Sequence, residues 1–154
     1  MMKLELVRDW MSRDVVTVGP DTLLPEANRL MMEKHVRRLP VVGNGRLLGI
    51  LTYGDIRGAG PSSASDLDVA EVSYLMGQIK VEQVMSQKLV TIDQDATIGE
   101  AAELMLQYAI GGLPVLGPDG ALIGIITESD IFRLVVHGWR RTQDDSSTPY
   151  THYG

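Results

Sequence analysis

The chain has 154 residues, of which 44% are hydrophobic, and a formal net charge of −6. This composition predicts a globular rather than a disordered protein, and the acidic balance argues against nucleic acid as the main partner. The absence of cysteine excludes disulfides, thiolate nucleophiles and cysteine-based metal sites.

Nothing in the sequence indicates a secretion signal or a membrane-spanning segment. The start, MMKLELVRDW, becomes amphipathic and charged too early for a signal peptide. No apolar run approaches the roughly 18 residues that span a bilayer. Together with the lack of cysteine, which fits a reducing compartment, these features predict a soluble cytoplasmic protein.

The sequence contains one unit twice. GILTYGDI at Gly49–Ile56 returns as GIITESDI at Gly124–Ile131, and LPVVG returns as LPVLG. Upstream, VRDWMSRDVVTV at Val7–Val18 is echoed by VEQVMSQKLVTI at Val81–Ile92. A duplicated unit of about 55 residues predicts a pseudo-twofold assembly, so a site built by one copy should have a counterpart in the other.

In the first copy the pattern predicts a strand, a helix, two further strands and a second helix. Val15–Val18 is a β-branched run, and apolar residues then recur at helical spacing with Pro25 in the first turn. Asn44-Gly45 between Val41-Val42 and Leu47–Leu51 predicts a hairpin with a type I′ turn, because that turn needs two positive φ angles.

The second copy repeats these elements after a linker. Gly58–Ser65 (GAGPSSAS) predicts a flexible joint, and Asp66–Ile79 has the apolar pattern of a linker helix. A strand at Leu89–Ile92, a helix with a T-x-x-E capping box at Thr97, and a hairpin through Pro118-Asp119-Gly120 follow. The predicted domains are a first unit at 1–60, a linker with a helix at 61–79, a second unit at 80–138, and a polar, flexible tail at 139–154.

In both copies a strand ends in Thr-x-x-Asp where a helix begins, at Thr52 with Asp55 and at Thr127 with Asp130. One interpretation is structural, because T-x-x-D is itself a capping box. The other is a ligand site. The strand-to-helix turn and the Thr hydroxyl suit a phosphate, and the carboxylate, which only accepts, suits the two hydroxyl donors of a ribose. This second interpretation indicates a nucleotide.

With these motifs the chain resembles a tandem pair of cystathionine-β-synthase-type (CBS) domains, a Bateman module. The resemblance covers about Leu6–Arg57 and Val81–Val136, through the VRDWMS and VEQVMS starts, the VVTV, LVTI, LPVV and LPVL strands and the two G-h-h-T-x-x-D turns. It implies an α/β (α+β) fold of two pseudo-twofold-related β-α-β-β-α units, packed with their sheets face to face and joined by a linker helix. It also implies two clefts between the halves that bind AMP, ADP, ATP or S-adenosylmethionine, with no further cofactor required.

The resemblance assigns site residues by position. Asp55 and Asp130 resemble the ribose-binding aspartates of the family, and Thr52 and Thr127 resemble its phosphate-side hydroxyls. The residues that resemble the backbone and walls around the adenine are Val16, Thr17, Pro40, Val90, Thr91 and Pro114.

The copies differ just before the LPV strand, where the first has Arg37 and Arg38 and the second has two glycines. Basic residues at this place in the family can reach phosphates, which makes both arginines candidate phosphate ligands and the two clefts unequal. The alternative is that one or both are surface charges at a helix C-terminus, where the helix dipole favours them. His35 is interpreted as a helix-end residue, and no histidine has a spacing that indicates a metal site.

The function implied is a stand-alone regulatory module, an energy or metabolite sensor that is not an enzyme. The sequence shows no catalytic triad or dyad, no P-loop and no metal cluster. Modules of this family self-associate through helices, so a homodimer is expected, acting on a separate protein target. One alternative is a structural or dimerisation adaptor with vestigial clefts. Another is an enzyme with a nucleotide substrate, which is disfavoured because only Asp55 or Asp130 could act as its base.

Overall fold

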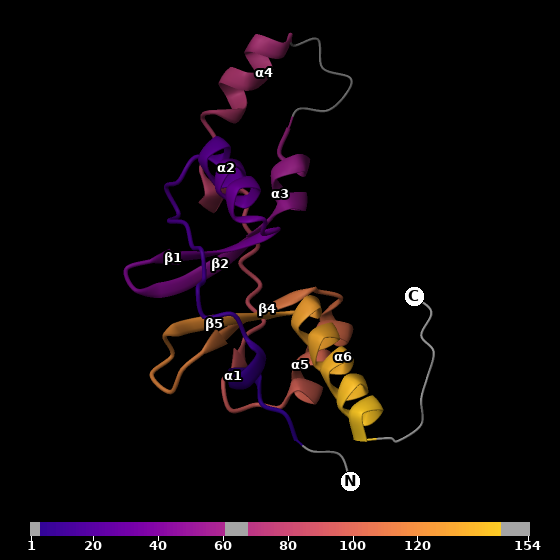
Figure 1. Cartoon of the computed structure of the whole chain (residues 1–154). Helices are drawn as coiled ribbons and strands as arrows, with labels where there is room; N and C mark the ends of the chain where they lie inside the picture. The colour runs from indigo at the N-terminus through magenta and orange to yellow at the C-terminus, as the bar shows by residue number, and fades with distance from the viewer. Residues whose placement is uncertain (1–3, 61–67, 146–154) are drawn as a thin grey trace.

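The computed structural model describes residues 4–60 and 68–145. Figure 1 shows two halves stacked on one another, with a β-hairpin of each half at the centre and helices on the outside. The first repeat contains α1 (Val7–Trp10), α2 (Leu24–Lys34), β1 (Arg38–Gly43), β2 (Arg46–Thr52) and α3 (Tyr53–Gly58). Then follow α4 (Val69–Met76), the 3-10 turn η1 (Val81–Gln83), β3 (Ile92–Asp93), α5 (Ile98–Tyr108), β4 (Gly112–Leu116), β5 (Leu122–Thr127) and α6 (Glu128–Asp145). The predicted mixed architecture of two repeated halves is therefore confirmed.

The two hairpins have equivalent registers. β1 and β2 pair antiparallel around Asn44 (φ 51°) and Gly45 (φ 74°), so the two positive φ angles predicted for this turn are present. β4 and β5 pair antiparallel around a longer turn in which Gly120 has φ 81°. The pairing shifts just after Val41 in the first hairpin and just after Val115 in the second. This irregularity is therefore part of the repeat.

The strand predicted at the start of each repeat is mostly absent. Val15–Val18 makes only an isolated parallel bridge at Val18, and Leu89–Ile92 contributes only its last residue to β3. The reason lies upstream, where Ser12 pairs with Ile125 of the other hairpin at N···O distances of 2.9 and 3.0 Å. A chain that crosses from one hairpin to the other meets the second sheet only at its end, so β-branched composition alone does not make a full strand there.

The halves exchange the segments that open each repeat. Val7 and Met11 of the first repeat lie in the hydrophobic cluster of the second half, and Val81 of the second repeat lies in that of the first. Matching hydrogen bonds hold the exchanged segments. Val7 N donates to Ala96 O at 2.8 Å, and Val81 N donates to Thr22 O at 2.8 Å. Because each half buries apolar side chains of the other, the two halves stabilise one another.

The exchange explains a glycine that both repeats carry at the same place. A Cβ on Gly49 would lie 2.7 Å from Met85 Sδ, and one on Gly124 would lie 2.6 Å from Met11 Sδ. The carbonyl oxygen of the residue after each methionine would be as close, at 2.7 and 2.9 Å. The crossing segments therefore run directly over the hairpins, where only glycine leaves room.

Helices α2 and α5 begin differently and end alike. α5 opens on the predicted capping box, in which Thr97 and Glu100 each accept the other's backbone N–H at 3.1 Å. α2 instead has Pro25 in its first turn, as predicted. Both helices end at a non-glycine residue in the left-handed conformation, His35 and Ala109, each with φ 54°. His35 is therefore a helix-end residue, as expected.

The linker helix is present as α4, capped by the Asp68 side chain, which accepts from Glu71 N at 2.8 Å. Of the predicted flexible joint, Gly58 belongs to α3, and residues 61–65 lie outside the described residues. α4 buries no side chain of its own. Figure 1 shows it standing away from the hairpins, beyond α2 and α3.

The C-terminal helix differs from the prediction. The sequence predicts a flexible tail from residue 139, whereas α6 continues through Gly138 to Asp145. Residues 146–154 lie outside the described part of the chain. A glycine weakens a helix by only about 1 kcal/mol, and Thr142 Oγ1 bonds back to Gly138 O at 3.0 Å. The last turns also begin beside a tertiary contact, between the rings of Trp10 and His137. Across residues 4–60 and 68–145, no helix has the length and apolarity needed to cross a membrane.

Candidate functional site

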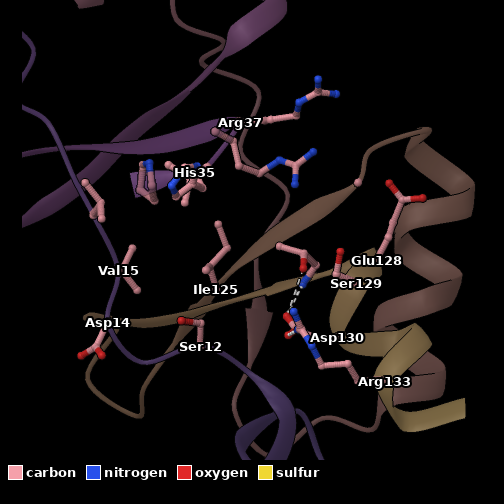
Figure 2. A pocket seen from close by; sticks show the side chains of 16 residues that line it. Ser12, Asp14, Val15, His35, Arg37, Ile125, Glu128, Ser129, Asp130 and Arg133 are labelled. Atoms are coloured by element: carbon pink, nitrogen blue, oxygen red, sulfur yellow. Dashed lines mark hydrogen bonds and ion pairs between the residues drawn. The ribbon is translucent and has the colours of Figure 1, made fainter. Parts of the chain in front are cut away.

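A cleft of about 560 Å³ opens between the two halves. The crossing segment after α1 and the approach to β1 form one side, and the turn from β5 into α6 forms the other (Figure 2). Its volume is within the range of small-molecule sites. The lining residues are Ser12, Asp14, Val15, Val16, His35, Val36, Arg37, Arg38, Pro40, Gly111, Ile125, Thr127, Glu128, Ser129, Asp130 and Arg133.

Asp130 is a buried carboxylate of this cleft, 7% exposed. Its Oδ2 accepts from Thr127 N at 2.8 Å and from Thr127 Oγ1 at 3.1 Å. Its Oδ1 accepts from Arg133 Nη1 at 2.7 Å, one turn further along α6. Burying a charge is costly unless the charge is paired and hydrogen-bonded. Thr127 and Arg133 thus hold the carboxylate in place at the cleft wall.

The corresponding turn of the first repeat is a complete capping box. Thr52 Oγ1 accepts from Asp55 N at 3.1 Å, and Asp55 Oδ2 accepts from Thr52 N at 2.8 Å. The structural interpretation of T-x-x-D is therefore confirmed at this turn. In the second repeat the hydroxyl donates to the carboxylate instead, and Arg133 stands where the first repeat has Gly58. The two turns are alike in backbone and unlike in the surroundings of the carboxylate.

Arg37 and Arg38 line the cleft, and neither forms an ion pair with any residue that the structure describes. The Arg38 guanidinium lies over the glycines of the second repeat, since a Cβ on Gly112 would be 3.0 Å from Nη1 and one on Gly111 would be 2.9 Å from Nη2. Burial lowers the pKa of Arg38 below its usual value, Glu128 raises it, and Arg37 lowers it further. Arginine nevertheless stays protonated at neutral pH, so Arg37 and Arg38 each contribute a positive charge to the cleft lining.

The cleft brings together half of the site residues predicted from the sequence: Val16, Arg37, Arg38, Pro40, Thr127 and Asp130. The wall residues and arginines come from the first repeat and the Thr-Asp turn from the second, so the cleft is a composite of both. The predicted residues that do not line it are Thr17, Thr52, Asp55, Val90, Thr91 and Pro114. Among these, Thr91 lines a separate depression of about 620 Å³ at the two hairpin turns.

Other lining residues were not predicted. Asp14 and Val15 belong to the crossing segment, whose path no local pattern reveals. Arg133 follows Asp130 at the i+3 spacing of neighbouring side chains on a helix, so this spacing was a signal that could have found it. Glu128 stands within the T-x-x-D motif, at a position to which the motif assigns no role. Among the described residues, no group of three or more His, Cys, Asp or Glu could hold a metal ion.

The chain is similar in sequence to proteins with CBS domains. The model of the CBS domain family matches residues 7–62 and 81–137. A CBS domain-containing protein of Dictyostelium discoideum is 38% identical over 132 residues, which cover 85% of this chain and 91% of that protein. Several other curated relatives are much longer. The chain spans 46% of one from Methanocaldococcus jannaschii and 22% of the inosine-5′-monophosphate dehydrogenase of Korarchaeum cryptofilum.

Solved structures of CBS domain pairs have the same fold. The CBS domain pair of protein MJ0100, in complex with 5′-methylthioadenosine and S-adenosyl-L-methionine, matches with a TM-score of 0.73 at 26% identity, covering 88% of this chain and 99% of that one. CBSX2 of Arabidopsis thaliana, in complex with AMP, matches with a TM-score of 0.72 at 27% identity and the same coverage, 88% and 99%. With its two repeats and stacked hairpins, the chain therefore belongs to the CBS domain family, as a tandem pair of CBS domains.

Proposed function

We propose that the chain is a regulatory module that binds an adenosine-containing ligand, AMP, ADP, ATP or S-adenosylmethionine, in the cleft between its repeats. The observation that carries this proposal is the composite cleft, which joins an apolar wall at Val16 and Pro40 to the Thr127–Asp130 turn of the other repeat. Two structures of similar fold hold ligands of this chemistry, AMP in one and 5′-methylthioadenosine with S-adenosyl-L-methionine in the other.

Each part of the cleft suits one part of such a ligand. Val16 and Pro40 would cover the faces of the adenine, and the backbone near Thr17 would meet its polar edge. The Asp130 carboxylate, already fixed by neighbouring donors, would accept from the ribose hydroxyls. The groups proposed to contact a phosphate are the Thr127 hydroxyl and the guanidinium groups of Arg37 and Arg38.

The duplication supports a second, unequal site. By the repeat, it would combine the wall residues Val90, Thr91 and Pro114 of the second repeat with the turn at Thr52 and Asp55 of the first. Glycines take the place of the arginine pair in the second repeat, as the sequence shows. We therefore expect this site to favour adenosyl ligands without a phosphate.

A ligand that contacts both repeats can regulate, because its affinity then depends on how the halves are arranged. We propose that the module is not itself an enzyme and passes its ligand state to a separate protein target in the cytoplasm. Large apolar side chains are exposed on α6, among them Phe132 (63%) and Val135 (63%). Such a surface favours self-association as a homodimer.

Isothermal titration of the purified chain with AMP, ADP, ATP and S-adenosylmethionine tests the proposal. Asp130→Ala and Asp55→Ala should each cost about 2–3 kcal/mol of affinity at their own sites, because charge-assisted hydrogen bonds to the ribose are lost. Asp21→Ala removes an exposed carboxylate outside the cleft and should leave the affinity for every ligand unchanged. Retained affinity in both site variants would contradict the ribose assignment. No heat with any ligand would favour a structural or dimerisation adaptor with vestigial clefts.

A further inference from the structure

The cleft is balanced in charge. Apart from His35, its charged lining residues are three arginines and three carboxylates: Arg37, Arg38, Arg133, Asp14, Glu128 and Asp130. Arg133 and Asp130 pair with each other, so the two remaining arginines share the cleft with two carboxylates. Figure 2 shows Glu128 on the α6 side of the cleft and Asp14 on the opposite side. A polyphosphate would thus enter a cleft that lacks a net positive charge to compensate it.

Glu128 is held beside the arginine pair by the main chain. Its N–H donates to Gly111 O at 3.1 Å. Its carboxylate and Arg38 Nη2 both crowd the point where a Cβ on Gly111 would sit. The positive charge of Arg38 therefore lies close to the negative charge of Glu128, and any phosphate that approaches Arg38 also approaches this carboxylate.

The first repeat has no acid at the equivalent position. Tyr53 N donates to Arg37 O at 2.9 Å, which is the same main-chain contact. The Tyr53 ring lies instead beside Arg57, whose Cζ is 5.9 Å from the ring centroid. Since the backbone geometry is made with tyrosine as well as with glutamate, the fold does not require a carboxylate here. The negative charge of Glu128 is therefore not needed for folding, and it acts on whatever enters the cleft.

We propose that Glu128 selects ligands by charge. It competes with ligand phosphates for Arg37 and Arg38, so the cleft takes adenosyl ligands with a single phosphate or a cationic group in preference to diphosphates and triphosphates. This inference rests on the proposed function and narrows its ligand class. The added phosphates of a triphosphate increase the repulsion from Glu128, whereas a cationic group is attracted to it.

Titration of AMP and ATP into the full chain and into Glu128→Gln tests this selection. The variant keeps the size of the side chain and removes its charge. The ratio of ATP affinity to AMP affinity is expected to rise about five-fold, the size of one unfavourable contact between partly exposed charges. Glu103→Gln removes an exposed carboxylate of α5 that lies outside the cleft, and it should leave the ratio unchanged. Glu128→Tyr, with the residue of the first repeat, provides a second removal of the charge.

Each outcome separates this inference from the function on which it rests. An ATP affinity above that of AMP in the unmodified chain overturns the inference and leaves the proposed function standing. The same holds if both nucleotides bind and neither Glu128 variant changes the ratio. Equal gains for both nucleotides place the effect at the adenosine and also overturn it. If none of AMP, ATP and S-adenosylmethionine binds the unmodified chain, the proposed function itself fails.

Discussion

Replacing Val7 by alanine tests the exchange of segments between the halves. Val7 opens the first repeat, yet it is fully buried, 0% exposed, in the hydrophobic cluster of the second half. Removing two methyl groups costs about 1.6 kcal/mol in transfer free energy, and the cavity adds to this, so we expect the free energy of unfolding to fall by about 2 kcal/mol. Val81→Ala should cost a similar amount, since Val81 is equally buried in the first half.

Double-mutant cycles measured by urea unfolding assign Val7 to one cluster or the other. Combined with Ile98→Val, in the cluster of the second half, Val7→Ala should be non-additive by about 0.5 kcal/mol or more. Combined with Val41→Ala, in the other cluster, the two losses should add. Val69→Ala serves as the control, because that side chain is 83% exposed and its removal should change stability by less than about 0.5 kcal/mol.

The reverse pattern would refute the exchange. If Val7→Ala were coupled to Val41→Ala and additive with Ile98→Val, the opening segment would pack on its own repeat in solution. A loss for Val7→Ala as small as that of the exposed control would show that the side chain is not buried at all. Either result would also mean that no crossing segment lies over Gly124 in solution.

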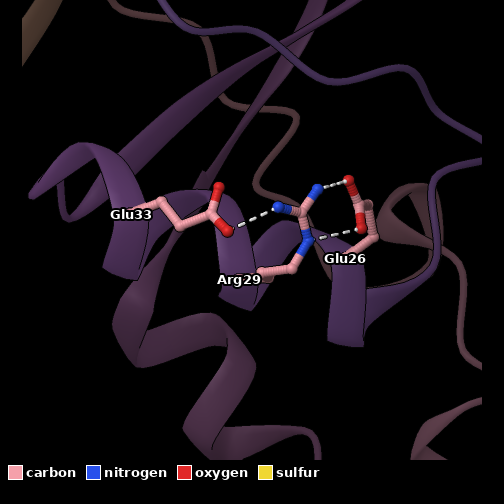
Figure 3. Close-up of polar contacts among 3 residues, drawn as sticks. All are labelled: Glu26, Arg29 and Glu33. Carbon is pink, nitrogen blue, oxygen red and sulfur yellow. Dashed lines mark hydrogen bonds and ion pairs between the residues drawn. The ribbon is translucent and has the colours of Figure 1, made fainter.

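Three further changes probe separate contacts. Gly124→Ala should lower stability by about 2 kcal/mol in urea unfolding, because its Cβ would lie 2.6 Å from Met11 Sδ; an unchanged unfolding midpoint would contradict the close crossing. Ala109→Gly should raise stability by about 0.5–1 kcal/mol, because Ala109 ends α5 at φ 54°, which glycine adopts without strain; a lower melting temperature would contradict this. The Arg29 guanidinium donates hydrogen bonds to Glu26 and Glu33 of α2 (Figure 3). The hydrogen bond to Glu26 lowers the pKa of that carboxyl below its usual value of 4.5. Arg29→Ala should therefore lower the melting temperature slightly at neutral pH, with a difference that vanishes as the pH falls through the lowered pKa; a difference that persists in stronger acid would refute this origin.

Elements decided by neighbouring residues were predictable from the sequence. The turn at Asn44-Gly45 and the capping box at Thr97 depend on residues only a few positions apart, and both are present. Val15–Val18 has the composition of a strand, but it lies at the end of the stretch that crosses from the other half, so only Val18 pairs with its own hairpin. The C-terminal helix likewise extends past the contact between Trp10 and His137, which lie far apart in the chain. Local patterns do not contain such contacts.

The residue types of the candidate site were visible in the sequence, and their grouping was not. The repeated motif pointed to Asp130, and the difference between the copies pointed to Arg37 and Arg38. Arg38 lies against Gly112 of the other repeat only because the two halves stack. The same stacking places Glu128 beside the arginines, where no pattern in its own repeat would predict a neighbouring charge.

By itself, the sequence determined that the chain is a duplicated α/β unit with two Thr-x-x-Asp turns, because repetition and turn chemistry are properties of residues close together. Only the tertiary structure decided which turn meets which wall. The cleft takes its wall from one repeat and its Thr127–Asp130 turn from the other, because the opening segments exchange and the hairpins stack. Those contacts join residues distant in sequence, whose meeting depends on the packing of the whole chain.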